Sequence, residues 1–207
     1  MEEVYIDSWL KLAARIEEWA KTPSMFRGVV RDSYELIPKI GRPETRNPGP
    51  YSEPLEKEIF SRFKSHGRAH LENPPTDDFE WLIIGQHHGL PTRLLDWTFS
   101  PLVATYFAVE QGGAEGDAAI YVAHCPKQLH WMSGDPFAVK GDVVQLAPPY
   151  ISPRVSLQRS LLTLHPEPNK PYVPEGLIKA VIPKGFCSRL KRLCFTTTAS
   201  LSSSSSF

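Results

Sequence analysis

The sequence predicts an α+β fold, a single domain in which helices flank a mixed β-sheet. Two observations favour it. Short apolar runs with the length of strands occur among segments of helical periodicity, and no internal repeat or shift in composition marks a second domain. The length of 207 residues is also enough for one large core. The expected strands lie near residues 25–30, 118–125, 142–146, 155–164 and 176–183.

The first two helices are predicted from the spacing of their apolar residues. In residues 7–21, tryptophan, leucine, alanine and isoleucine recur on one face at helical spacing, and Pro23 ends the segment. A second helix over about residues 55–65 has Leu55, Ile59 and Phe63 at every fourth position. We therefore expect each helix to have one face on the core.

Capping signals mark the next two helices. Asp77 and Glu80 have the spacing of a capping box, and Gly89 is a typical residue at a helix end. The following helix begins at a serine-proline pair and continues through residues 102–109, which are apolar on nearly all sides. We expect this fourth helix to be buried.

Charge and composition limit the partners and the location of the protein. Lysine plus arginine and aspartate plus glutamate number 23 each, so no overall field attracts nucleic acid or an anionic membrane. No apolar run approaches the roughly 20 residues of a membrane span, and the acidic N-terminus is unlike a signal peptide. Three cysteines without CxxC spacing favour neither a disulfide framework nor a zinc site. We expect a cytoplasmic protein with neither nucleic acid nor a membrane as partner.

Arg27 is the first candidate for a binding residue. In the expected strand at residues 25–30 it shares a face with apolar side chains, and its guanidinium keeps its proton, so it needs an anionic partner. One possibility is a phosphate-bearing or ribose-bearing ligand, which Gly28 would allow close to the backbone. The other is an internal carboxylate, for which Asp96 is favoured.

Polar side chains crowd the junction between the third and fourth helices. They are Gln86, His87, His88, Arg93, Asp96 and Thr98. Burying them unpaired would be costly, so they must bond one another or face a ligand. Adjacent histidines project about 100° apart on a helix and cannot share one metal ion, so no metal is expected. For Asp96 and Thr98 the alternative is that they bond nearby backbone N–H groups and shape the turn.

The most specific motifs are Phe26-Arg27-Gly28, the run from Gln86 to Thr98, Ser100-Pro101-Leu102-Val103-Ala104 and Tyr106-Phe107-Ala108. They resemble those of the FRG domain, a bacterial and phage module. The resemblance covers roughly residues 8–192, and the domain is expected over residues 8–195.

The C-terminal end departs from that resemblance. Residues 196–207 are rich in threonine and serine, which predicts a disordered tail. FRG domains usually continue at this point with a helix and a closing segment. We therefore expect a truncated variant that leaves apolar surface near Leu190 and Leu193 unburied.

The FRG pattern is distantly similar to that of ADP-ribosyltransferases, which implies a fold like theirs and NAD as cofactor. Arg27 matches their first motif, which holds NAD, and Thr98 matches the second. A third motif normally supplies a glutamate, whereas this chain offers the uncharged Gln158, which removes electrostatic stabilisation of the transition state. The implied catalytic residues are Arg27, Thr98 and Gln158, and the implied cofactor-binding residues are Arg27, Gly28, Gln86, His87, Arg93 and Asp96.

These implications lead to two hypotheses about function. The first is a nucleotide-recognising protein that uses NAD for ADP-ribosyl transfer to an unknown protein target, or hydrolyses NAD, in a toxin or defence role. The second is a non-catalytic structural or interaction module. Under the first hypothesis, Arg27, Gln86 and Thr98 should lie in one pocket.

Overall fold

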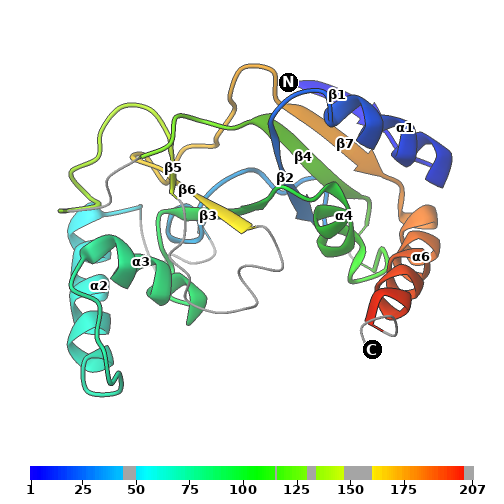
Figure 1. Cartoon of the computed structure of the whole chain (residues 1–207). Coiled ribbons are helices and arrows are strands. Elements are labelled where there is room, and N and C mark those ends of the chain that lie inside the picture. Colours follow the sequence, from blue (N-terminus) through cyan, green and yellow to red (C-terminus); the bar gives the residue numbers. More distant parts are fainter. Residues whose placement is uncertain (44–49, 115, 130–133, 147–159, 203–207) are drawn as a thin grey trace. The chain divides into compact units, whose positions relative to one another are not determined.

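The computed structural model describes residues 1–43, 50–114, 116–129, 134–146 and 160–202. Figure 1 shows the helices and strands of these residues. In chain order they are β1 (Glu2–Tyr5), α1 (Trp9–Trp19), β2 (Ser24–Val29), η1 (Lys39–Gly41), α2 (Glu53–Gly67), α3 (Asp78–His87), β3 (Leu94–Thr98), α4 (Pro101–Val109), β4 (Ala118–His124), β5 (Val144–Leu146), β6 (Ser160–Leu164), β7 (Ile178–Ile182) and α6 (Lys184–Ser202).

Over the described residues, seven strands form one mixed sheet in the order β1-β7-β4-β2-β3-β6-β5. β1 pairs with β7 in parallel, while β7–β4, β4–β2, β2–β3 and β6–β5 are antiparallel. The predicted α+β class with a mixed sheet is therefore confirmed. Among the described helices, none is long and apolar enough to span a bilayer.

The chain divides into two compact units. Unit 1 consists of Met1–Tyr34, Trp97–Cys125 and Val173–Phe207, and unit 2 of Glu35–Asp96 and Pro126–Tyr172. The chain passes from unit 2 into unit 1 within β3, between Asp96 and Trp97.

In unit 1, three helices cover one face of the strands β1, β7, β4 and β2. The core on this face joins α1, α4 and α6 to alternate residues of the strands, as the two-residue period of a strand requires. Its members include Leu12, Trp19, Phe26, Ala104, Ala108, Ile120, Val122, Ala180, Ile182, Phe186 and Leu190.

Helix α4 lies unusually close to β2. A Cβ atom built on Gly28 would be 1.9 Å from the carbonyl oxygen of Ala104 and 2.6 Å from the backbone nitrogen of Ala108. Any side chain at Gly28 would force the helix away from the strand. The glycine of the tripeptide is therefore required by packing, whereas contact between Gly28 and a ligand stays a prediction.

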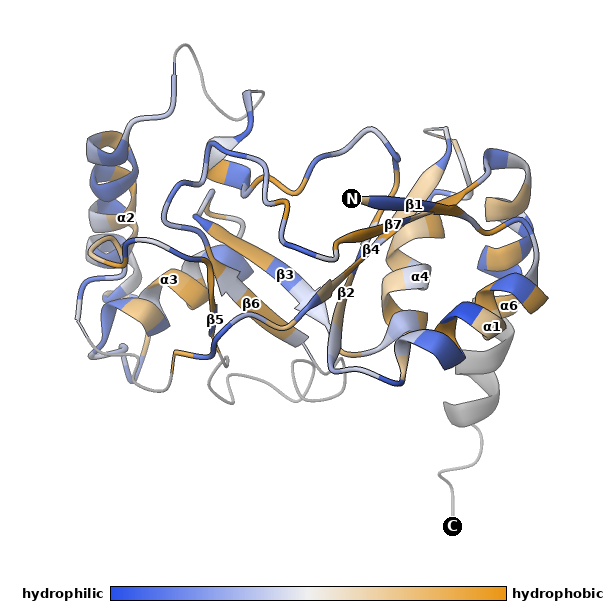
Figure 2. Ribbon diagram, turned by 90° about the horizontal axis from the view of Figure 1, so that it is seen from above, coloured by the Kyte–Doolittle hydropathy of each residue, from blue (hydrophilic) through white to orange (hydrophobic). Residues whose placement is uncertain are grey.

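Unit 2 has its own core, formed by α2, α3, β3, β5 and β6. Apolar residues from these elements and from the loop at Phe137 pack together. Figure 2 shows both hydrophilic and hydrophobic residues on α2, as expected for a helix with one face on a core. The rings of Phe60 and Phe137 meet edge to face at 5.5 Å.

The predicted caps are present. The side chain of Asp77 accepts a hydrogen bond from the N–H of Phe79 at the start of α3, and that of Ser100 accepts from Val103 at the start of α4. Gly89, just after α3, has a φ of 87°, as expected for a residue that ends a helix.

Four expectations need correction. The buried residues of α2 are Glu56 and Phe60, and Leu55 is exposed, so the predicted apolar stripe was displaced by one position. Helix α4 is buried on one face only, since Leu102 and Phe107 are exposed. Leu190 is fully buried although it was expected to be uncovered, whereas Leu193 is exposed.

The fourth correction concerns residues 94–98, which were expected in the turn between the third and fourth helices and instead form strand β3. The segment contains three large apolar residues, but it is only five residues long and has the charged Asp96 at its centre, so no strand pattern stood out. At the other end of the chain, α6 runs to Ser202 and so enters the expected tail. The disorder of residues 196–207 stays a prediction.

Candidate functional site

A row of long side chains crosses the strands of unit 1. Arg27 on β2 lies opposite Tyr121 on β4, and Tyr121 lies opposite Lys179 on β7. Directly opposed residues share a face of the sheet. Arg27, Tyr121 and Lys179, called the Arg27 row below, therefore lie on the face away from Phe26 and Gly28, which α4 covers.

The middle of the Arg27 row is fixed by one hydrogen bond. Tyr121 is buried, and its hydroxyl donates to the backbone oxygen of Tyr34 at 2.7 Å. Arg31 lies over the ring of Tyr34, 5.8 Å from its centroid. Arg27 itself is half-buried.

Two carboxylates lie near Lys179. The Nζ atom of Lys179 is 3.4 Å from Oε2 of Glu3 and 3.7 Å from Oδ2 of Asp32. The Lys179 side chain is 12% exposed, whereas those of Glu3 and Asp32 are 40% and 42% exposed. A hydrogen bond from Tyr5 and the charge of Lys179 lower the pKa of Glu3. The row thus contains two cations and an aromatic ring, and its lysine is paired with two carboxylates.

Thr98 points away from the Arg27 row. It lies opposite Phe26 in the β2–β3 pairing, and neighbouring residues of a strand face opposite sides. Its Oγ1 accepts a hydrogen bond from the N–H of Ser100 at 3.0 Å, just before α4. This contact confirms the interpretation that Thr98 shapes the turn, and the register argues against one pocket that holds both Arg27 and Thr98.

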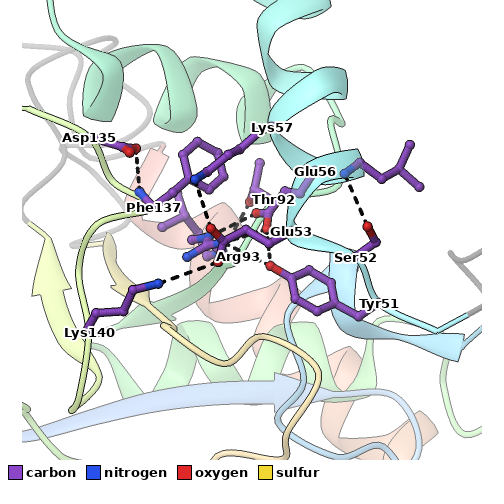
Figure 3. Close-up of polar contacts among 12 residues, drawn as sticks. Tyr51, Ser52, Glu53, Glu56, Lys57, Thr92, Arg93, Asp135, Phe137 and Lys140 are labelled. Atoms are coloured by element: carbon purple, nitrogen blue, oxygen red, sulfur yellow. Dashed lines mark hydrogen bonds and ion pairs between the residues drawn. The ribbon is translucent and has the colours of Figure 1, made fainter.

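Arg93 belongs to a buried ion pair in unit 2. Its Nε donates to Oε1 of Glu56 at 3.1 Å, and its Nη2 donates to Oε2 of Glu56 at 2.8 Å and to the Tyr51 hydroxyl oxygen at 3.0 Å. The Tyr51 hydroxyl in turn donates to Glu56 at 2.6 Å. Figure 3 shows the three side chains pointing toward one another. We call Tyr51, Glu56 and Arg93 the Arg93 network.

The Arg93 network is closed and locally neutral. The side chains of Arg93 and Glu56 are 0% and 2% exposed, and their two-pronged pairing is the strong form of a charged contact. Among the described residues, Nη1 of Arg93 has no hydrogen-bond partner, but the guanidinium carbon lies 4.5 Å from the centroid of the Phe137 ring.

The raised pKa values of Tyr51 and Arg93 agree with the burial of the network. Burial raises the pKa of Tyr51, and the hydrogen bond to Glu56 raises it further. Burial alone would lower the pKa of Arg93, but the hydrogen bonds and charge of Glu56 raise it above its ordinary value. Binding of a cofactor by Arg93 stays a prediction.

Sequence reasoning missed Glu56 and Tyr51. The displaced stripe on α2 placed Glu56 among solvated residues, although its i,i+4 relation to Phe60 could have indicated a buried position. Tyr51 lies in a proline-rich loop segment without periodicity.

Gln86 connects two polar residues of unit 2. Its Nε2 donates to Oδ1 of Asp96 at 2.8 Å, and its Oε1 accepts a hydrogen bond from the Thr92 hydroxyl. The Thr92 oxygen also accepts from the N–H of Leu94 at 3.2 Å. These groups bond one another, as one of the two interpretations predicted. Pairing of Asp96 with Arg27 stays a prediction.

The remaining predicted site residues contribute less. His87 and His88 are exposed, with their rings perpendicular at 5.7 Å. Within the described parts of the chain, no three histidine, cysteine, aspartate or glutamate side chains gather as a metal site would require. Gln158 lies outside the described residues.

Comparison with known families agrees with the motifs. Residues 22–116 match the family model of the FRG domain. This stretch contains both Phe26-Arg27-Gly28 and the run from Gln86 to Thr98, so the resemblance to the FRG domain is confirmed over this part of the chain. No curated protein and no solved structure gives a match to the chain.

Proposed function

We propose that this FRG domain binds a nucleotide, with NAD as the candidate, and that Arg27 holds an anionic group of it. The observation that carries the proposal is the Arg27 row. The arginine of the family motif lies half-buried on β2, beside the aromatic ring of Tyr121. A guanidinium stays charged at any physiological pH and matches the geometry of a phosphate.

The proposed reaction is NAD-dependent ADP-ribosyl transfer to a protein target, or NAD hydrolysis, in a toxin or defence role. The contacts support binding more directly than chemistry. The Thr98 oxygen accepts a hydrogen bond beside the start of α4, and the third motif supplies Gln158 instead of a carboxylate. Binding is therefore the property to test first.

A non-catalytic structural or interaction module is the second candidate. It is favoured by the use that the fold makes of other motif residues. Gly28 admits α4, Arg93 is neutralised by Glu56, and Gln86 bonds Asp96. If Arg27 also had only a structural role, the motif would stabilise the fold and hold no ligand.

Calorimetric titration with NAD separates the two candidates. We expect the unaltered protein to bind NAD and Arg27→Ala to weaken binding by on the order of 1.5–3 kcal/mol, the range for a charged hydrogen bond. Arg62→Ala is the matched control, because Arg62 is exposed on α2 and pairs with Glu58 on the same helix. No NAD affinity in the unaltered protein, with a loss of thermal stability in Arg27→Ala, would favour the module.

A further inference from the structure

We propose that the outer edge of strand β1, the edge away from β7, pairs with the same edge of a second copy of this chain. The product is a two-fold symmetric dimer in which the sheet continues from one copy into the other. The inference is independent of the proposed function, because β1 lies outside the residues that match the family model.

The two edge strands of the sheet differ in how they are covered. Over the described residues, β1 lies at one edge and β5 at the other. The chain itself covers β5, because the N–H of Gln145 donates to the Lys127 oxygen at 3.0 Å and the N–H of Leu129 donates to the Gln145 oxygen at 2.9 Å. No described strand or bridge covers the outer edge of β1 in this way. An uncovered strand edge is a template for pairing with another chain.

The hydrogen bonds of β1 show which of its backbone groups face outward. In the parallel pairing with β7, the N–H groups of Glu2 and Ile6 donate to backbone oxygens of the partner segment at 3.0 and 2.8 Å. Alternate residues of a strand direct their N–H and C=O groups to the same side. The N–H of Val4 is therefore directed toward β7, whereas the N–H groups of Glu3 and Tyr5 are directed toward the outer edge.

Exposed apolar side chains accompany this edge. Four large hydrophobic side chains are exposed among the first ten residues, namely Met1 (68%), Tyr5 (60%), Trp9 (44%) and Leu10 (80%). Scattered exposed hydrophobic residues are normal on a protein surface, but four within ten consecutive residues around an uncovered strand favour a protein interface.

The charges of β1 select one register for the pairing. Around a two-fold axis perpendicular to the sheet the strands are antiparallel, and the outward groups of Glu3 and Tyr5 form the hydrogen-bonded pairs. An axis at Glu3 places this residue opposite its own copy, and an axis at Tyr5 places Glu3 opposite Asp7. Like charges directly opposite one another are destabilising. An axis at Val4 places Glu3 opposite Tyr5 instead, and Lys179, 3.4 Å from Glu3, offsets its charge.

The first test is the oligomeric state in solution. Sedimentation velocity over a wide range of protein concentration should show a monomer–dimer equilibrium. Tyr5→Pro removes an outward N–H twice per dimer and should weaken dimerisation by at least about ten-fold. Proline is tolerated on an edge strand where the N–H faces solvent, so circular dichroism should show an intact fold. Tyr5→Ala is the matched control, because it removes the side chain but keeps the N–H, and it should weaken dimerisation less.

Val4→Cys tests the register, also in case Tyr5→Pro fails to fold. On the axis, the two copies of residue 4 form a non-hydrogen-bonded pair with Cα atoms about 4.5 Å apart, within the range of a disulfide. Mild oxidation should therefore link Val4→Cys into covalent dimers. Tyr5→Cys should stay unlinked, because its two copies would be roughly 8 Å apart, and the unaltered protein gives the background of its own three cysteines.

Three results would each overturn the inference. They are a protein that stays monomeric at every concentration, a dimer that Tyr5→Pro leaves unchanged, and covalent dimers that form with Tyr5→Cys but not with Val4→Cys. None of them bears on NAD binding, so the proposed function stands or falls separately.

Discussion

Arg27 and Arg93 are two motif arginines in contrasting environments. Arg93 is fully buried and makes a two-pronged contact with the buried Glu56. Arg27 is half-buried, and its cross-strand neighbours are a tyrosine and, one strand further, another cation. Arg93 has a buried carboxylate at hydrogen-bond distance, whereas Arg27 lies in a row whose other cation, Lys179, pairs with the exposed side chains of Glu3 and Asp32.

This difference shows that the surroundings of a motif residue must be known before a role is assigned to it. An arginine with a buried carboxylate at hydrogen-bond distance has most of its charge neutralised by the fold, and its removal would leave that carboxylate uncompensated. A half-buried arginine has no such fully buried pair, and its guanidinium stays charged at any physiological pH. Presence in the motif alone did not separate these two roles.

The largest effect of a substitution is expected at Arg93, and it tests the comparison directly. Arg93→Ala should lower the free energy of unfolding by roughly 3–5 kcal/mol, because Glu56 would remain buried without its partner. Arg62→Ala, which removes an exposed pair with Glu58, should cost about 0.5 kcal/mol or less. Urea unfolding followed by circular dichroism measures both. A loss of less than about 1 kcal/mol at Arg93 would show that the network is not structural.

Much of the fold was predictable because it depends on helix caps and apolar runs, which are formed by residues close together in the sequence. The caps at Asp77 and Ser100 and the apolar runs of β4 and β7 depend on neighbouring residues alone. β1 escaped prediction because it is an exposed strand at the edge of the sheet, and its pairing with β7 joins distant parts of the chain. Its four residues have no apolar alternation to detect.

The site was less predictable, because its contacts are long-range. The sequence indicated Arg27 and Arg93 but could not show that Glu56, 37 residues away from Arg93, supplies the buried carboxylate. Lys179 was also missed, since its relation to Arg27 follows from the register of three strands. For Thr98 the sequence left two interpretations open, and its hydrogen bond from the N–H of Ser100 agrees with the turn-shaping one.

The next effect concerns Gly28, the glycine of the Phe26-Arg27-Gly28 tripeptide. Gly28→Ala should destabilise the protein by roughly 1–3 kcal/mol, because the new methyl group would meet the backbone of α4. Gly185→Ala is the control, since a Cβ there meets nothing within 4 Å. Urea midpoints give the comparison. If Gly28 served ligand approach instead, Gly28→Ala would keep full stability and lose NAD affinity.

The smallest effect is expected at Tyr51, and it depends on pH. It tests whether the Arg93 network shields the Tyr51 hydroxyl from water. Tyr51→Phe removes the hydroxyl between Glu56 and Arg93 and should cost about 1 kcal/mol near neutral pH.

The pKa of Tyr51 is raised in the folded protein, chiefly by burial, above its ordinary value of about 10. The stability that this shift contributes is complete below about pH 10 and declines as pH rises from there toward the folded pKa. The unaltered protein should therefore lose stability faster than Tyr51→Phe above pH 10, measured as unfolding free energies between about pH 8 and 11. Parallel pH profiles would mean that the hydroxyl titrates as it does in the unfolded chain, and that the Arg93 network does not shield it from water.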